Sequence, residues 1–282
     1  MYFIGNALRL VENALNLGWQ VHLLFADYPN QTTFPTWYGR NDTVDWFPQF
    51  ADSNFALVGR ARRADFENQI LTWKPDLYIG MGHGFYNYCS GQPPTGGSQD
   101  NAYADPLLAT TGRYDGQNVT FDNTILSAGL KVYFEGCDTL NVVGPRCMDK
   151  GCREWLGNYG EGTPLFQESY SYYPSSQNYP STEKNVITDP YCKASDYITE
   201  HTELDMLNGL LAEQVYANAI NNMNTWLGYY SFGGQYYNEP ERADAIAWLN
   251  RAKEIFGYKA LPEVNFVFAK PYQAGMVNLT LG

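Results

Sequence analysis

The chain has 282 residues, of which 44% are hydrophobic and 17% charged, so it can bury one sizeable core and is not a disordered polyelectrolyte. Its 18 basic and 30 acidic residues give a net charge of −12, which argues against nucleic acid as a partner because phosphate binding needs a basic surface. No apolar run approaches the roughly 18 residues of a membrane-spanning helix, so no membrane span is predicted.

The first 25 residues alternate between strand and helix patterns. Tyr2–Ile4 is predicted to end a buried strand, and Asn6 to cap a helix over residues 7–17. Gly18 ends that helix, and the apolar segment 19–25 is the next buried strand. This alternation favours a parallel sheet with helices on both faces.

The alternation continues through the middle of the chain, interrupted by two loop-rich segments. Residues 27–60 hold three prolines and are predicted as loops, and residues 90–118 as a surface excursion. Outside these segments we expect a helix over residues 62–73 and short buried strands over residues 77–81 and 130–134.

The second half adds helices around a predicted insertion at about residues 160–200, which is rich in Tyr, Ser, Pro and Asn and has no clean period. The remaining predicted elements are a helix over 140–150, a strand over 152–157, helices over 203–230 and 240–256, and a last strand over 264–268. The sequence therefore predicts a single α/β domain over residues 1–282. No signal peptide is visible and the chain stops abruptly, so we expect it to be an excerpt of a longer protein.

The cysteines form an odd set: Cys89, Cys137, Cys147, Cys152 and Cys192. In a secreted chain four could pair and one would stay a thiol. Cys147 and Cys152 could pair with each other or be core thiols, and a bridge between Cys89 and Cys192 is conceivable. Three well-separated histidines cannot form a metal cage, so no metal is predicted, and no cofactor motif is present.

Four glycosylation sequons begin at Asn30, Asn41, Asn118 and Asn278. Together with a composition rich in Tyr, Asn and Gly, they favour a glycoprotein that is extracellular or on the cell surface.

Two of the predicted buried strands end in residues suited to nucleophilic chemistry. Strand 77–81 is followed by His83, and strand 130–134 by Cys137. Sites in parallel α/β sheets lie at the carboxyl ends of strands, so neighbouring strands would bring a thiol beside an imidazole, a nucleophile and its base. Glu135 and Asp138 are the candidate substrate-binding carboxylates next to that thiol, and they would suit a basic side chain.

The predicted helix over residues 140–150 adds to this expectation. Its dipole would stabilise a thiolate at Cys137 and lower the cysteine pKa. The backbone N–H groups of Gly84 and Cys137 could form an oxyanion hole, and Gly136 is small enough to leave the nucleophile uncovered.

The segments Leu77–Gly84 (LYIGMGHG) and Lys131–Thr139 (KVYFEGCDT) resemble the two motif blocks of caspase-like cysteine peptidases, a group that includes caspases, gingipains, legumain, clostripain and separase. His83 and Cys137 are 54 residues apart in this chain, against roughly 50 in caspases. The resemblance implies a three-layer caspase-like fold and a cofactor-independent endopeptidase acting on polypeptides. Cys137 would be its nucleophile and His83 its base. The sequence around Cys137 departs from the caspase pattern Gln-Ala-Cys-x-Gly.

Two alternatives stay open. One is a catalytically inactive caspase-like surface glycoprotein domain with a binding or assembly role, because a fold does not by itself imply activity. The other is a carbohydrate-active protein, motivated by the Tyr, Trp and carboxylate content and by the tyrosines in residues 170–179, which could form a sugar-binding platform.

Overall fold

The structure is a computed structural model of the whole chain. It describes residues 10–25, 53–82, 84–91, 106–114, 117–160, 190–239, 242–262 and 274–279. Several predictions fall outside these residues: the strand at 2–4, the cap at Asn6, the strand at 264–268, the tyrosines at 170–179, and the sequons at Asn30 and Asn41.

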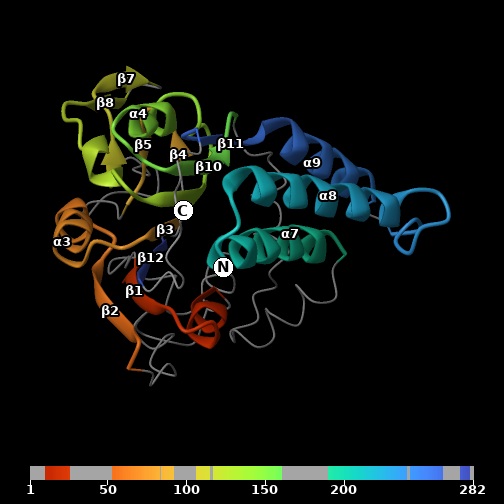
Figure 1. The fold of residues 1–282 in the computed structure, drawn as a ribbon. Coiled ribbons are helices and arrows are strands. Elements are labelled where there is room, and N and C mark those ends of the chain that lie inside the picture. The colour runs from red at the N-terminus through yellow and green to blue at the C-terminus, as the bar shows by residue number, and fades with distance from the viewer. Residues whose placement is uncertain are drawn as a thin grey trace, which may run out of the picture.

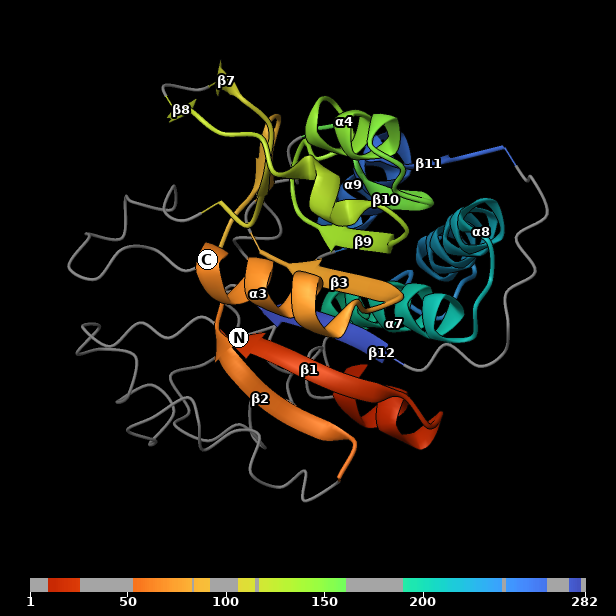
Figure 2. The ribbon, with the colours of Figure 1, turned by 60° about the vertical axis from the view of Figure 1, so that its left-hand side comes forward.

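The centre of the described fold is a seven-stranded sheet in the order β11-β10-β9-β3-β12-β1-β2 (Figures 1 and 2). Its strands are β1 (Gln20–Phe25), β2 (Phe55–Arg60), β3 (Leu77–Met81), β9 (Lys131–Glu135), β10 (Glu154–Asn158), β11 (Phe256–Ala260) and β12 (Ala274–Leu279). All neighbouring strands are parallel except β10 and β11. The prediction of an α/β fold with a mostly parallel sheet is therefore confirmed.

The helices pack against the sheet in two separate hydrophobic cores. They comprise a helix over residues 10–16, α3 (Arg63–Trp73), α4 (Val143–Asp149), α7 (Pro190–Leu207), α8 (Ala212–Tyr230), α9 (Arg242–Ile255) and the 3₁₀ turn η2 (Thr124–Ser127). One core joins Leu77 and Ile79 of β3 to α7, α8 and α9, and the other joins Tyr78 to α3 and α4. Successive side chains of a strand point to opposite faces, which is why consecutive residues of β3 enter different cores. Figure 2 shows α3 in front of the sheet and α7 behind it.

Two small sheets accompany the central sheet. The first consists of β4 (Gly84–Phe85), β5 (Tyr88–Cys89) and β6 (Leu108–Ala109), and the second of β7 (Gly112–Tyr114) and β8 (Gln117–Val119). Residues 90–118 were predicted as a surface excursion, but Leu107 and Leu108 are fully buried. Those apolar side chains pack into the core beside α3 and α4, so residues 107–108 belong to the domain core.

The helical region after residue 190 differs from the prediction in two ways. Residues 190–200, which we assigned to the insertion, form the first part of α7, and Ala194 and Ile198 there are buried in the core. The single helix predicted over residues 203–230 is two helices, α7 and α8. Gly209, with φ +77°, breaks the helix between them, because that left-handed backbone ends a right-handed helix at little cost for glycine.

Strands β2, β11 and β12 were not predicted. β2 lies in the segment expected to be loops, and β12 enters the middle of the sheet between β1 and β3. The position of β12 places Asn278 in a strand that is paired on both edges. Asn118, on β8, is exposed.

Among the described residues, no helix combines the length and apolar character needed to cross a membrane.

Candidate active site

The strands that precede His83 and Cys137 are hydrogen-bonded neighbours. β3 and β9 run parallel, with Leu77 opposite Lys131 and Met81 opposite Glu135, so both strands end at the same level. Just beyond the strands, the Gly82 N–H donates to the Glu135 carbonyl at 3.1 Å. The two motif-bearing strands are therefore adjacent, which is the condition under which a thiol and an imidazole would come together.

The residue after His83 lies directly against the nucleophile candidate. A Cβ atom built on Gly84 would lie 2.2 Å from the Cys137 carbonyl oxygen and 2.8 Å from its backbone nitrogen. Such distances are far inside van der Waals contact, so only glycine allows these two backbones to meet. His83 itself lies outside the described residues, but Gly82 and Gly84 on either side of it contact residues 135–137.

Gly136 is required for the same reason. Its added Cβ would lie 2.6 Å from the Phe134 ring and 2.7 Å from the Gly82 carbonyl oxygen. A side chain at residue 136 would thus separate the ends of β3 and β9. The glycines in both motif blocks permit close packing of the two loops.

Cys137 carries a half-buried thiol. Hydrogen bonds to residues at or just beyond the end of β10 hold its loop in place. The Asn158 amide donates to the Gly136 carbonyl at 2.9 Å, and the Asp138 N–H donates to the Gly160 carbonyl at 3.2 Å. These bonds hold the residues on both sides of Cys137. A nucleophile fixed by its neighbours needs little reorganisation before it reacts.

Asp138 shapes the turn that follows. Its φ is +58°, in the left-handed region that Asn and Asp tolerate better than most side chains, and only 5% of it is exposed. Its Oδ1 accepts a hydrogen bond from the Asn141 amide at 3.0 Å. These contacts favour a role in building the turn over a role in gripping substrate.

Glu135 lies beneath α7 and is also buried, with 9% exposed. The Thr199 hydroxyl donates to its Oε1 at 3.2 Å, whereas Oε2 has no hydrogen-bond partner among the described residues. Burial raises the pKa of Glu135 to about 7, and the Thr199 hydrogen bond opposes that shift. A carboxyl group buried in this way packs beneath the site. It has little open surface for contact with a large basic side chain of a substrate.

One sequence-based expectation about Cys137 is wrong. The helix predicted to start at residue 140 begins at Val143 and has seven residues. Residues 138–142 form turns, so Cys137 does not directly precede the helix. Because a helix dipole acts mainly within the terminal turn, α4 gives Cys137 little of the expected support.

The other described cysteines are buried thiols. Burial raises the pKa of Cys89 and Cys147 well above the ordinary value, and that of Cys152 to about 12. Cys147 and Cys152 are therefore core thiols rather than a disulfide, and Cys89 is not bridged to Cys192. A protonated, enclosed thiol is a poor nucleophile, so these three are chemically distinct from half-buried Cys137.

Sequence reasoning missed three supporting residues: Asn158, Gly160 and Thr199. Asn158 ends the parallel strand β10 and Gly160 lies two residues beyond it, which is a detectable signal. Nothing in the sequence marks Thr199. In the described part of the chain, no group of three or more His, Cys, Asp and Glu side chains is arranged to hold a metal ion.

No family model matches this chain, and the comparisons find no similar curated protein or solved structure.

Proposed function

We propose that this chain is a caspase-like cysteine endopeptidase in which His83 and Cys137 form the catalytic dyad. The observation that supports it best is the contact between the backbones of Gly84 and Cys137, at the joint carboxyl end of β3 and β9. It brings together two motif blocks that are 54 residues apart in the sequence. The proposal includes the three-layer caspase-like arrangement and an extracellular or cell-surface location.

In the proposed reaction the Cys137 sulfur attacks the carbonyl carbon of a peptide bond, and His83 takes up the thiol proton. The backbone N–H groups of Gly84 and Cys137 stabilise the oxyanion. The C–N bond then breaks as His83 returns the proton to the leaving amine. Water, deprotonated by His83, hydrolyses the remaining thioester and restores the thiol.

The loss of the thiol is the most direct test. Cys137→Ala should lower the cleavage of unfolded casein and of pooled fluorogenic peptides by at least about a thousandfold, because no other described thiol is available as a nucleophile. Cys147→Ala is the matched control and should keep its activity, since that thiol is buried in the core. Undiminished cleavage by Cys137→Ala would show that another group carries the reaction.

Alkylation of the folded protein tests the state of the same thiol. At pH 7.5, iodoacetamide should label Cys137, while Cys89, Cys147 and Cys152 should react only after unfolding because burial raises their pKa. Peptide mass spectrometry gives the extent of labelling at each site. Equal protection of Cys137 would contradict the proposed nucleophile.

A second candidate function is a non-catalytic caspase-like domain that binds a partner or has an assembly role. The short α4 favours it, because the helix dipole that would activate Cys137 is displaced. In that case neither Cys137→Ala nor the wild-type protein cleaves any substrate, and both keep the same fold and partners.

A further inference from the structure

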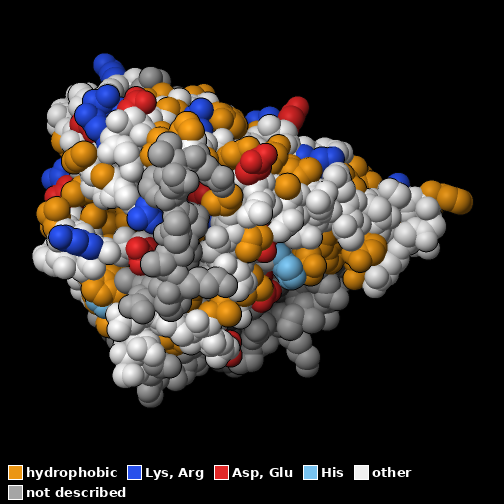
Figure 3. All heavy atoms as spheres, in the orientation of Figure 1, with side chains coloured by type: hydrophobic (Ala, Val, Ile, Leu, Met, Phe, Trp, Pro, Cys, Tyr) orange, Lys and Arg blue, Asp and Glu red, His pale blue; other side chains and the backbone are white. Residues whose placement is uncertain are grey.

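The C-terminal half of α8 and the loop that follows it carry an uncharged, aromatic surface. From Gln214 to Asn238 the sequence holds no Asp, Glu, Lys, Arg or His, although charged residues make up 17% of the chain. Figure 1 shows the α8–α9 loop, residues 231–239, projecting at one end of the molecule. Figure 3 shows that end covered mainly by hydrophobic side chains and by uncharged side chains or backbone. None of these residues belongs to the candidate active site.

Three aromatic side chains are exposed on this surface, and the buried Trp226 ring holds two of them in place. Tyr197 is 38% exposed, Tyr229 39% and Phe232 88%. Beneath them the Trp226 ring stacks on Tyr236, with 5.8 Å between ring centres and 10° between planes. Tyr229 lies 5.4 Å from Trp226 and nearly perpendicular to it, and Tyr197 lies 5.9 Å from the same ring. We call the exposed rings of Tyr197, Tyr229 and Phe232 the aromatic platform.

The α8–α9 loop is folded tightly against the end of α8. A Cβ atom built on Gly234 would lie 2.4 Å from the carbonyl oxygens of Gly228 and Tyr229, so only glycine fits there. The Tyr236 N–H donates to the Tyr229 carbonyl at 2.8 Å, and the Gly234 N–H donates to the Ser231 carbonyl at 2.8 Å. These contacts fix the rings before any ligand arrives, so binding needs little ordering of side chains.

Amide and hydroxyl side chains border the rings. Asn222 and Thr225 lie about two turns and one turn of helix before Tyr229, on the same side of α8. Thr225 is exposed, as are Gln235 and Asn238 in the α8–α9 loop. An amide offers both donors and acceptors, so these groups can hydrogen-bond with hydroxyl groups in either direction.

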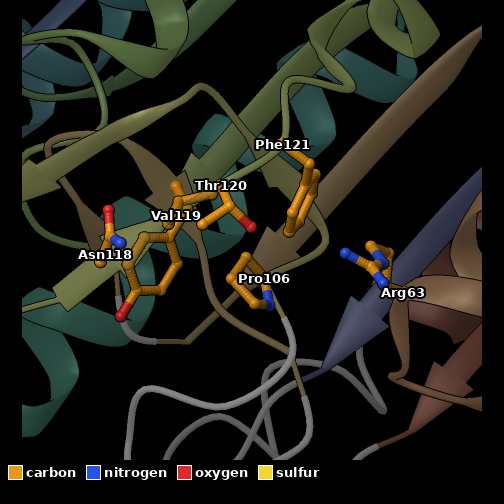
Figure 4. A pocket seen from close by; sticks show the side chains of 7 residues that line it. Arg63, Pro106, Asn118, Val119, Thr120 and Phe121 are labelled. Atoms are coloured by element: carbon orange, nitrogen blue, oxygen red, sulfur yellow. The ribbon is translucent and has the colours of Figure 1, made fainter.

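The pocket beside α3 differs in its chemistry (Figure 4). It measures about 190 Å³, and its lining includes Arg63 and Phe121. Arg63 is already engaged there, since its Nε lies 3.9 Å from Glu67 Oε1 and its guanidinium carbon lies 4.2 Å from the centre of the Phe121 ring. The aromatic platform, in contrast, presents exposed rings and no charge.

A neutral oligosaccharide fits this combination of groups. The C–H bonds on one face of a pyranose pack against the electron-rich face of an aromatic ring, while its hydroxyl groups need donors and acceptors at the edge. A membrane fits less well, because surface-bound helices hold Lys and Arg for the lipid headgroups, and residues 214–238 contain neither. Protein interfaces are likewise enriched in Arg.

We propose that the aromatic platform binds a neutral oligosaccharide. Its sugar rings stack on Tyr197, Tyr229 and Phe232, and its hydroxyl groups hydrogen-bond with the amide and hydroxyl side chains beside these rings. The site does not depend on the proposed peptidase activity.

Ligand-detected NMR on the full chain tests the proposal. The probes are cellohexaose, maltohexaose, mannohexaose, xylohexaose and chitohexaose, which differ in sugar and linkage but carry no charge. At least one should bind with a dissociation constant of about 1 mM or lower. Its affinity should stay within about twofold between low and high salt, because no ion pair contributes to binding. No binding of any probe, or an affinity that falls steeply with salt, would overturn the proposal.

Substitutions place the binding on the platform. Tyr229→Ala should weaken the binding of that probe about tenfold or more, whereas Tyr229→Phe should keep most of it because the ring remains. Phe232→Ala should weaken binding severalfold, and removing a ring that is 88% exposed should leave the core intact. Leu71→Ala is the matched control, since Leu71 is 62% exposed on α3, and it should bind as the wild type does.

Thermal unfolding checks that each variant is folded. Unchanged binding by folded Tyr229→Ala and Phe232→Ala would show that the sugar binds elsewhere. If no sugar binds and the chain instead sediments with phosphatidylcholine vesicles, with Phe232→Ala abolishing this, the surface is a membrane contact and the proposal is wrong.

Discussion

At the scale of single residues, Glu135 is the most unusual group near the candidate site. Its side chain is buried between β9 and α7, with one oxygen bonded to Thr199 and the other without a hydrogen-bond partner among the described residues. A carboxyl group so enclosed favours its neutral form, because water no longer stabilises the charge. Glu135 lies two residues before Cys137, so this buried carboxyl group borders the candidate site.

The stability of the folded state should therefore depend on Glu135. Its pKa is about 7 in the folded protein and near 4.5 when unfolded, so the folded state holds a proton that the unfolded state has lost between these values. As pH rises from 4.5 to 7, this group should remove roughly 3 kcal/mol of the free energy of unfolding. Glu135→Gln should abolish that part of the pH dependence and be the more stable protein at pH 8.

Urea unfolding at several pH values provides the measurement. Glu12→Gln, at an exposed position in the helix over residues 10–16, is the control and should leave the profile unchanged. Parallel profiles for Glu135→Gln and the wild type would show that this carboxyl ionises normally.

At the scale of secondary-structure elements, a buried ion pair connects the sheet to the turn between α7 and α8. Lys131 Nζ lies 2.9 Å from Glu154 Oε2, with side chains 1% and 7% exposed. Lys131 also donates to the Leu210 carbonyl, and Glu154 Oε1 accepts from the Ala212 N–H at 3.1 Å. Burial lowers the pKa of Lys131, and the Glu154 charge opposes this effect. The pair thus fixes where α8 begins relative to β9 and β10.

Removing one partner of this pair should cost more than removing both charges. Lys131→Met leaves the Glu154 carboxylate buried without a counter-charge, and we expect a loss of about 3–5 kcal/mol in the free energy of unfolding. The double variant Lys131→Met/Glu154→Gln should recover more than half of that loss, because the substituted amide is neutral and its oxygen can still accept from the Ala212 N–H. Equilibrium unfolding in urea measures both. Additive losses would contradict a coupled pair.

At the scale of the whole molecule, the C-terminal strand holds the sheet together. β12 lies between β1 and β3, with parallel pairing on both sides, so among the described strands the β1–β2 pair reaches the rest of the sheet only through β12. The β7–β8 hairpin, in contrast, pairs with no other described strand. A central strand opens only when the surrounding structure opens, whereas an isolated hairpin opens locally.

Hydrogen exchange should separate these two regions. The backbone amides of β12 and β3 should be among the slowest to exchange, near the limit set by global unfolding, and those of β7 and β8 among the fastest. Exchange measured by mass spectrometry on peptides covering residues 274–279 and 112–119 resolves the two. Rapid exchange in β12 would show that it is not a central strand.

The sequence alone predicted the elements whose pattern is local. Strand β3 and helix α3 were predicted to within a residue, and β9 and α9 to within two, because short apolar runs and helical periodicity depend only on neighbouring residues. The same reasoning singled out Cys137 and the His-Gly motif, since both directly follow such runs. It failed for β2, β11 and β12, whose strand form depends on pairing with distant segments.

The order of the strands could not be derived in this way. Strand order is decided by which segments bury one another's surface, and that requires contacts across the whole chain. Only the tertiary structure shows that β12 lies inside the sheet and that α7 packs over Glu135. It also shows that α4 begins farther from Cys137 than the sequence predicted. The sequence therefore indicates which residues form the candidate site. Their environment, and with it their reactivity, is set by packing between segments far apart along the chain.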